Sequence, residues 1–182
     1  EHRDIPRETI INEFGAFIFD AQAAKANGLV DEVMGRDEFF RHAAEAAGLM
    51  RGALDLTVGY VKQREQFGQP LGAFQAIRHR LAEDAQIVRA CRLLALRAAH
   101  ADTDREASIA ALHAQDTMRK LITDCHQFCG AMGLTLEFPL HLWTYRLKVL
   151  QGEAGGRAAQ ARAGAAATWP RQTTHTREEE IA

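Results

Sequence analysis

Apolar residues recur every three or four positions along most of this chain, and three long helices follow from that spacing. The first is predicted over residues 36–63, the second over 73–101 and the third over 104–129. Each has its apolar residues on one stripe, as a helix that packs in a bundle requires. Because long helices joined by short loops are neighbours, we expect an up-down, largely antiparallel bundle.

Shorter segments complete the pattern. A fourth helix is predicted over residues 140–150 and a fifth over 157–167. Residues 1–35 lack this helical period, and their short apolar run and a turn followed by a short strand are β-prone. The polar tail after residue 167 contains three consecutive glutamates, and we expect it to be mobile. The sequence therefore predicts an all-α fold with three parts: an irregular N-terminal segment (1–35), a helical bundle (36–167) and a tail (168–182).

Composition narrows the class of protein. The chain has 182 residues, of which 47% are hydrophobic, which is enough for one core of ordinary size. The formal net charge is -2 and the cations are spread along the helices, so we expect no nucleic-acid partner. The sequence has no run of about 18 apolar residues, so we expect no membrane span. With no apolar signal core at the N-terminus, and with an odd number of cysteines, we expect a cytoplasmic setting.

The three cysteines, Cys91, Cys125 and Cys129, are predicted to be core residues. Cys125 and Cys129 are four apart and share a helix face. A metal site would need further ligands at suitable spacing, and His126 points off that face. We therefore expect no metal.

Residues 60–75, YVKQREQFGQPLGAFQ, hold the most informative segment. One helix ends with a cation and an aromatic residue, and a turn with glycine and proline opens the next helix. Arg64 is suited to paired hydrogen bonds with a phosphate, and Phe67 to contact with a planar ring. Taken alone, these residues fit better with a structural interpretation, in which Arg64 caps a helix and Phe67 plugs the end of the bundle.

The pattern Arg-x-Gln-Phe-Gly-x-Pro-Leu-x-x-Phe-Gln resembles the signature between the first two helices of the C-terminal domain of acyl-CoA dehydrogenases. In that family the arginine and the residue two positions later contact the FAD diphosphate of a neighbouring subunit. The resemblance implies this role for Arg64 and Gln66. It also implies that Phe67 packs on the flavin nucleotide and that Gln75 lies near the same cofactor.

A second segment, residues 127–139, is similar to the family pattern Gln-x-x-Gly-Gly-x-Gly-x-Thr-x-Glu-x-Pro. An ordinary glycine C-cap would explain its first glycine, although a glycine-rich helix end also lets backbone approach a ligand. The resemblance implies that Gln127 and Gly130 reach the adenosine part of the partner's FAD. The second glycine of the pattern is Ala131 here, and its methyl group narrows that approach.

The resemblance leaves the catalytic base open. In the family a glutamate removes the α-proton of an acyl-CoA while the β-hydrogen leaves as hydride to the flavin, and burial suits a carboxylate to this task. Most members have this glutamate at a position that falls on Ala154 here, and Glu153 is one residue away. Isovaleryl-type members have it on the first helix, at the position of Glu38. Glu38 also fits as a solvated acid at a helix start, and Phe39 replaces the arginine that usually follows. Glu38, Glu153 and the absence of a functional base all stay open.

Three hypotheses of function follow. The resemblance implies an FAD-dependent α,β-dehydrogenation of an acyl-CoA thioester by a homo- or hetero-oligomer, with electron-transfer flavoprotein as the acceptor. The alternative is a non-catalytic helical subunit that assembles with a dehydrogenase partner, which Phe39 and Ala154 favour. In the third, the first 35 residues derive from a hydratase or hydrolase fold, because residues 19–33 are faintly similar to crotonase-like proteins and some serine peptidases.

Overall fold

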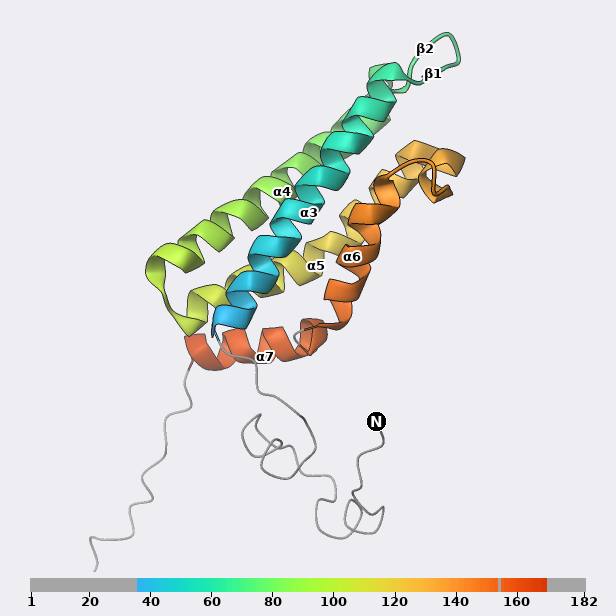
Figure 1. Cartoon of the computed structure of the whole chain (residues 1–182). Coiled ribbons are helices and arrows are strands. Elements are labelled where there is room, and N and C mark those ends of the chain that lie inside the picture. Colours follow the sequence, from blue (N-terminus) through green and yellow to red (C-terminus); the bar gives the residue numbers. More distant parts are fainter. Residues whose placement is uncertain (1–35, 154, 170–182) are drawn as a thin grey trace, which may run out of the picture. The chain divides into compact units, whose positions relative to one another are not determined.

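The computed structural model describes residues 36–153 and 155–169, which form a helical bundle (Figure 1). Its elements in chain order are α3 (Arg36–Gln63), β1 (Glu65–Gln66), β2 (Gln69–Pro70), the 3-10 helix η2 (Leu71–Ala73), α4 (Gln75–Ala101), α5 (Asp104–Cys129), the 3-10 helix η3 (Gly130–Leu134), α6 (Leu140–Gly152) and α7 (Gly156–Thr168). The predicted all-α class is confirmed. None of these described helices is long and apolar enough to cross a membrane. The predicted N-terminal segment, Ala154 and residues 170–182 of the tail lie outside the described residues.

The connection between α3 and α4 is a two-residue β-hairpin, where the sequence had predicted only a turn. Gln66 pairs with Gln69, and the two residues between them, Phe67 and Gly68, have φ angles of 55° and 80°. Positive φ at both central positions is the geometry of a tight hairpin whose twist matches that of its strands. Because a 3-10 turn follows the hairpin, α4 begins at Gln75 and not at residue 73.

A two-residue loop joins α4 to α5 and makes them antiparallel neighbours. Asp102 ends α4 in the left-handed region at φ 51°, and its N–H donates to the Ala98 carbonyl. Thr103 then caps α5, because its hydroxyl accepts from the Glu106 N–H at 3.4 Å. The sequence Thr-x-x-Glu is the usual signature of such a start. The loop therefore holds the end of α4 beside the beginning of α5.

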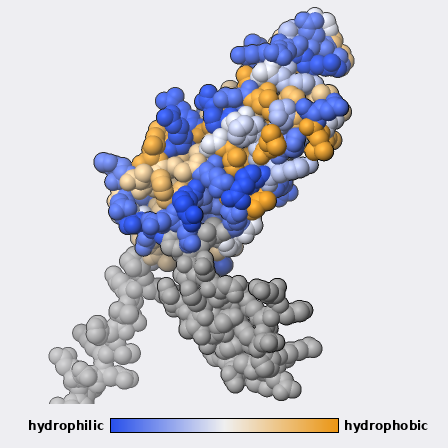
Figure 2. Space-filling model, viewed as in Figure 1, coloured by the Kyte–Doolittle hydropathy of each residue, from blue (hydrophilic) through white to orange (hydrophobic). Residues whose placement is uncertain are grey.

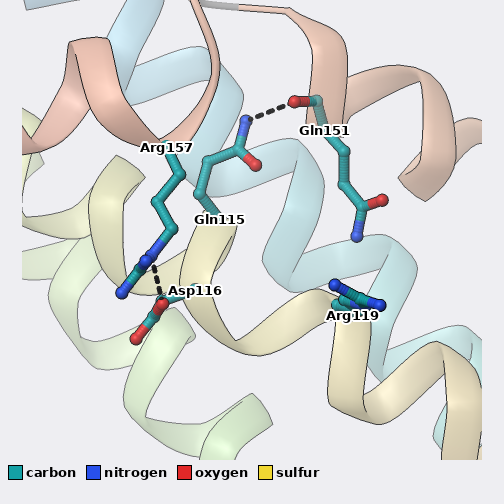
Figure 3. Close-up of a pocket in the computed structure, with 5 residues that line it drawn as sticks. All are labelled: Gln115, Asp116, Arg119, Gln151 and Arg157. Atoms are coloured by element: carbon teal, nitrogen blue, oxygen red, sulfur yellow. Dashed lines mark hydrogen bonds and ion pairs between the residues drawn. The ribbon is translucent and has the colours of Figure 1, made fainter.

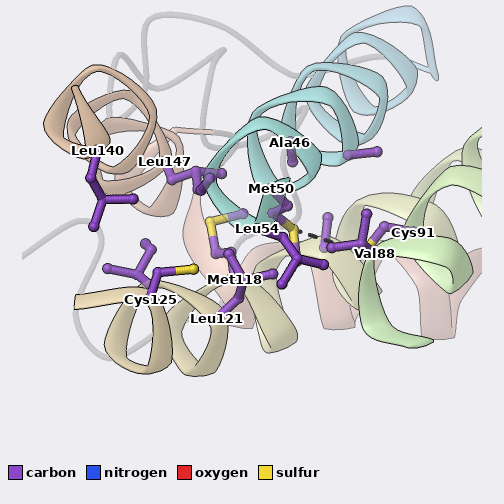
Figure 4. Close-up of a cluster of buried hydrophobic side chains, with 14 of the residues drawn as sticks. Ala46, Met50, Leu54, Val88, Cys91, Met118, Leu121, Cys125, Leu140 and Leu147 are labelled. Atoms are coloured by element: carbon purple, nitrogen blue, oxygen red, sulfur yellow. Dashed lines mark hydrogen bonds between the residues drawn. The ribbon is translucent and has the colours of Figure 1, made fainter. Parts of the chain in front are cut away.

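Helix α3 is central in the bundle, since it packs against α4, α5 and α6, while α7 packs mainly on α5. Figure 4 shows the core where these helices meet, with Met50 and Leu54 from α3 facing Met118 and Leu121 from α5. Burying one such side chain completely stabilises the fold by about 1.5–3 kcal/mol. All three cysteines are free and buried, as the sequence predicted, and burial raises the pKa of the Cys125 thiol to about 12.

A buried ionic network joins α4 to α5, and the sequence analysis did not anticipate it. Lys120 of α5 lies 2.8 Å from a carboxylate oxygen of Asp84 and 2.9 Å from one of Asp124. Asp124 also accepts from Arg80, whose guanidinium lies 5.2 Å from the centre of the Phe128 ring. Both aspartates are almost completely buried. The network therefore ties the first turns of α4 to the last turns of α5.

Close packing of α3 against α6 gives the first prediction. A β-carbon added at Gly52 would lie 2.8 Å from the nearest ring carbons of Trp143. We expect Gly52→Ala to lower the free energy of unfolding by about 1–3 kcal/mol, because the indole or the helix has to move. The matched control is Gly48→Ala on the same helix, where nothing lies within 4 Å of the added carbon. That control gains up to about 1 kcal/mol from helix propensity. Equal stability of the two variants in urea denaturation would contradict the prediction.

Candidate functional site

The hairpin between α3 and α4 carries three of the candidate cofactor residues. Phe67 lies at its tip with 89% of its surface exposed, and its ring meets Phe74 edge-on with centres 6.2 Å apart. Arg64 and Gln66 are exposed as well. The backbone beneath them is held, because Arg64 N–H donates to the Tyr60 carbonyl at 2.9 Å. The interpretation of Phe67 as a plug for the bundle end is therefore wrong, because the ring projects away from the core.

The second candidate segment lies at the end of α5. Gln127 is exposed on the last turn, and Gly130 ends the helix at φ 58° with its N–H donating to the His126 carbonyl. Only glycine adopts this backbone conformation without strain. An added β-carbon at Gly130 would meet nothing within 4 Å, so the backbone there is open to a ligand. At Gly133, by contrast, an added carbon would come within 2.9 Å of the Cys129 β-carbon, so close packing explains that glycine.

These two segments lie at the same end of the bundle, at the upper right of Figure 1. The ring of Tyr60, one turn before the hairpin, packs edge-on against Phe138 with centres 5.3 Å apart. Gln75, the remaining candidate, is exposed on the first residue of α4. Arg78, which the sequence analysis did not assign, is exposed one turn later. This end therefore combines exposed guanidinium groups, an exposed aromatic ring and open glycine backbone.

The two candidate bases lie elsewhere. Glu38 is half-buried in the first turn of α3, and Glu153 caps the end of α6. Arg146 donates from Nη1 to Oε1 of Glu153 at 2.7 Å, and it donates from Nε to Glu45 at 2.5 Å. Its hydrogen bonds with Glu45 and Glu153 raise the pKa of Arg146, so the guanidinium stays charged. Both oxygens of Glu153 accept from this one guanidinium, which weakens the case for Glu153 as a base.

His42 lies near this ion pair and was missed by the sequence analysis. Its side chain is 4% exposed, one helical turn after Glu38. Neither ring nitrogen has a hydrogen-bond partner among the residues that the structure describes. Burial lowers the pKa of His42, while the charges of Glu153 and Glu45 act in the opposite direction. The sequence could have pointed to His42 through its position four residues after Glu38, which is the spacing of side chains on one face of a helix.

The candidate base and the candidate cofactor residues of one chain are far apart. Glu38 and Arg64 stand near opposite ends of α3, 26 positions apart in the sequence. At about 1.5 Å per helical residue, this spacing corresponds to about 39 Å. One dinucleotide does not span that distance. Glu38 and Arg64 of the same chain therefore do not serve the same cofactor molecule.

A polar pocket of about 380 Å³ lies where α5 meets the end of α6 and the start of α7 (Figure 3). Its lining residues are Gln115, Asp116, Arg119, Gln151 and Arg157. Asp116 forms an ion pair with Arg157 at 2.5 Å, and Gln115 donates to the Leu150 carbonyl at 2.8 Å. The lining is polar and carries one more cation than anions. It suits a small anion better than an acyl chain, and no feature of the sequence pattern had pointed to it.

Comparison with known proteins relates this bundle to acyl-CoA dehydrogenases. Residues 37–168 match the family model described as the acyl-CoA dehydrogenase C-terminal domain. Acyl-CoA dehydrogenase FadE34 of Mycobacterium tuberculosis is 38% identical over 121 residues, which cover 63% of this chain and 17% of that protein. Butyryl-CoA dehydrogenase from Megasphaera elsdenii superposes with a TM-score of 0.69 at 30% identity, over 73% of this chain and 36% of that one.

The ChsE4-ChsE5 complex of Mycobacterium tuberculosis also superposes, with a TM-score of 0.60 at 25% identity, over 68% of this chain and 35% of that one. In each of these comparisons the matched part is well under half of the other protein. The chain therefore corresponds to one part of its larger relatives.

Proposed function

The chain belongs to the acyl-CoA dehydrogenase family, and from this we propose that it is the helical flavin-binding part of an enzyme that dehydrogenates the α,β-bond of an acyl-CoA thioester. The observation that carries the proposal is the exposed hairpin of Arg64 and Phe67, which lies at the same end of the bundle as the open glycine that ends α5. An alternative function is that of a non-catalytic subunit of such an enzyme, which the engagement of Glu153 by Arg146 favours.

The hairpin has the properties of a preformed contact for a planar, charged ligand. A non-glycine residue in the left-handed region costs about 1–3 kcal/mol, and such strain persists where the structure around it demands it. At Phe67 that strain holds a large ring in solvent instead of in the core. The nearby guanidinium of Arg64 is suited to paired hydrogen bonds with a diphosphate. An aromatic ring beside an arginine fits both chemical features of FAD.

The described residues fit FAD, so each can be given a role. Arg64 and Gln66 hold the diphosphate, Phe67 packs on the nucleotide, and Gln75 lies close to it. Gln127 and the backbone at Gly130 receive the adenosine part. Bound FAD would supply the hydride acceptor for the β-hydrogen of the substrate. At the other end of α3, Glu38 takes the α-proton, and its half-buried position in the first turn of the helix suits a carboxylate base.

The separation along α3 supports an oligomer that shares its cofactors. Because Arg64 and Glu38 are about 39 Å apart along the helix, each serves a different site, and the cofactor held by the hairpin works with a neighbouring chain. Leu142, Tyr145 and Val149 are exposed on α6, and Figure 2 shows hydrophobic surface over the region where α6 lies. An apolar face of this kind suits burial against another chain, in a homo- or hetero-oligomer. Electron-transfer flavoprotein is the acceptor we propose.

The decisive experiment is a visible absorption spectrum of the purified chain supplied with FAD, before and after addition of short, branched and long acyl-CoAs. Bound flavin that bleaches with one of them supports the dehydrogenase and names its substrate class. Bound flavin that no acyl-CoA bleaches supports the non-catalytic subunit. A chain that stays colourless contradicts the assignment of the hairpin.

Removal of the Arg64 guanidinium tests the hairpin directly. Charge-assisted hydrogen bonds contribute about 1.5–3 kcal/mol, so we expect Arg64→Ala to raise the dissociation constant for FAD by about 10- to 100-fold. Equilibrium dialysis against FAD measures this effect. Arg92→Ala, which removes an exposed arginine from the middle of α4, is the matched control and should bind FAD normally. An unchanged flavin content in Arg64→Ala would remove Arg64 from the site.

A further inference from the structure

His42 is a buried polar side chain whose hydrogen-bonding capacity goes unused within the described part of the chain. It is 4% exposed, and both Nδ1 and Nε2 lie out of contact with solvent and without a described partner. A buried polar group left in this state costs free energy that an apolar side chain of similar size would not. Such a group therefore calls for an explanation, and a ligand that supplies the missing hydrogen bond is one.

The charged groups around His42 are already paired with one another. Arg146 donates to Glu45 at 2.5 Å and 3.0 Å, and to Glu153 at 2.7 Å. Burial and the charge of Arg146 lower the pKa of His42, against the opposing influence of Glu153 and Glu45. His42 is therefore neutral near pH 7, and a neutral imidazole offers one N–H donor and one nitrogen acceptor.

The position of His42 relative to the candidate base indicates what it meets. Residues four apart on a helix lie on the same face, so Glu38 and His42 point to the same side of α3. One helical turn, about 5.4 Å, separates them along the axis. An acyl chain that ran along this face of α3 from a reacting carbon beside Glu38 would pass His42, and the imidazole, which is buried in the free chain, would turn towards it to make contact.

We propose that His42 is a specificity-determining residue that hydrogen-bonds a neutral oxygen substituent, a hydroxyl or keto group, on the acyl chain beyond the reacting carbons. This inference rests on the proposed function, with Glu38 as the base. A neutral oxygen fits because hydroxyl and keto oxygens pair with a neutral imidazole. A carboxylate substituent does not fit, because the anions Glu45 and Glu153 lie close by and Arg146 is already occupied by them.

A site of this kind discriminates strongly. When a site is built to hydrogen-bond an oxygen of the substrate, an analogue without that oxygen leaves buried polar groups unpaired, and its reaction is penalised much more than the loss of one methylene would explain. The His42 imidazole has no hydrogen-bond partner in the described part of the chain, so this penalty is already present there before a substrate binds. Hydroxy- or keto-acyl-CoA substrates remove it, and unsubstituted ones do not.

The test compares acyl-CoAs of one chain length that carry no substituent, a hydroxyl, a keto group or a terminal carboxylate. Their dissociation constants are measured by calorimetry with the FAD-loaded full chain, and flavin bleaching is followed in parallel. We expect the hydroxy or keto compound to bind about 10- to 100-fold more tightly than the unsubstituted one. His42→Leu should bring that ratio close to one. His42→Gln, which keeps a donor and an acceptor, should retain a preference.

His100→Leu, the same change at an exposed position on α4, is the matched control, and thermal unfolding shows that each variant is folded. A wild-type chain that binds all acyl-CoAs equally, or a His42→Leu variant that keeps the full preference, overturns the assignment of His42 and leaves the proposed function standing. Failure of the wild-type chain to bind any acyl-CoA overturns both. A preference for the carboxylate compound also overturns the assignment, because it reverses the expected charge selectivity.

Discussion

Glu38→Gln is expected to abolish turnover while the chain keeps its fold and its flavin. A positioned general base contributes about 10²–10⁴-fold to a rate, and glutamine cannot take the α-proton. We therefore expect flavin reduction by the preferred acyl-CoA to slow by about 1,000-fold. The substitution preserves the shape of the side chain, so the half-buried first turn of α3 should pack as before. Stopped-flow measurement of flavin bleaching under anaerobic conditions gives the rate directly.

Asp37→Asn is the matched control, since Asp37 is an exposed acid next in sequence to Glu38 and pairs with Arg36. It should reduce flavin at the normal rate. Full activity of Glu38→Gln rules out Glu38 as the base, and Glu153→Gln then becomes the variant to examine, despite the pairing of Glu153 with Arg146. If the wild-type chain binds FAD but both wild-type and variant chains fail to reduce it, the non-catalytic subunit is the better account.

Lys120→Met is expected to lower the free energy of unfolding by about 3 kcal/mol, the largest stability effect we predict. Breaking a buried ion pair on one side typically costs about 3–5 kcal/mol, because the opposite charge is left unpaired. Here Asp84, which is 0% exposed, would lose its ion-pair partner, while Asp124 would keep its ion pair with Arg80. The Lys120 side chain is itself 41% exposed, which places the expected value at the lower end of that range. Chemical denaturation at pH 7 measures the change.

The pH dependence of the variant provides a second readout. Burial raises the pKa of Asp84, and the hydrogen bond from Lys120 opposes that effect. Without the lysine, the folded state should therefore bind a proton more tightly than the unfolded state does. The free energy of unfolding of Lys120→Met should then recover as the pH falls through the raised pKa of Asp84 towards the unfolded value of about 3.9.

Two further variants separate the network from general surface effects. Lys148→Met removes an exposed lysine from α6 and should change the stability by less than about 0.5 kcal/mol. Adding Asp84→Asn to Lys120→Met removes the carboxylate that has lost its partner, while Asp124 keeps Arg80, so the double variant should regain part of the lost stability. A loss for Lys120→Met no larger than that for Lys148→Met would mean that the network contributes nothing measurable.

Much of the bundle could be predicted from the spacing of apolar residues. The predicted bounds of α3 and α5 agree with the structure because both helices have long, regular apolar stripes facing a continuous core. The prediction placed the start of α4 two residues too early and made α6 and α7 each two residues too short. These ends depend on local backbone geometry, such as the 3-10 turn before α4, and apolar spacing carries no information about it.

The candidate cofactor residues could be named from the sequence because two segments resemble motifs of a known family and occur in the same order along the chain. The sequence could not show that Phe67 faces solvent, since an aromatic residue between two helices is equally consistent with a plug. The Phe67 ring lies in solvent because two consecutive positive φ angles turn the chain into a tight hairpin with Phe67 at its tip.

The sequence by itself determined the helical class and the limits of the main helices, because periodicity is a property of a linear chain. The residues proposed to hold FAD followed from the resemblance of two segments to a known family. Only the tertiary structure revealed the ion pair of Lys120 with Asp84, the ion pair of Arg146 with Glu45, and an imidazole at His42 that has no hydrogen-bond partner among the described residues. The two ion pairs join helices distant in sequence, and the state of His42 depends on what covers its side chain. Burial and electrostatic pairing arise only when the helices pack against one another, so no local pattern encodes them.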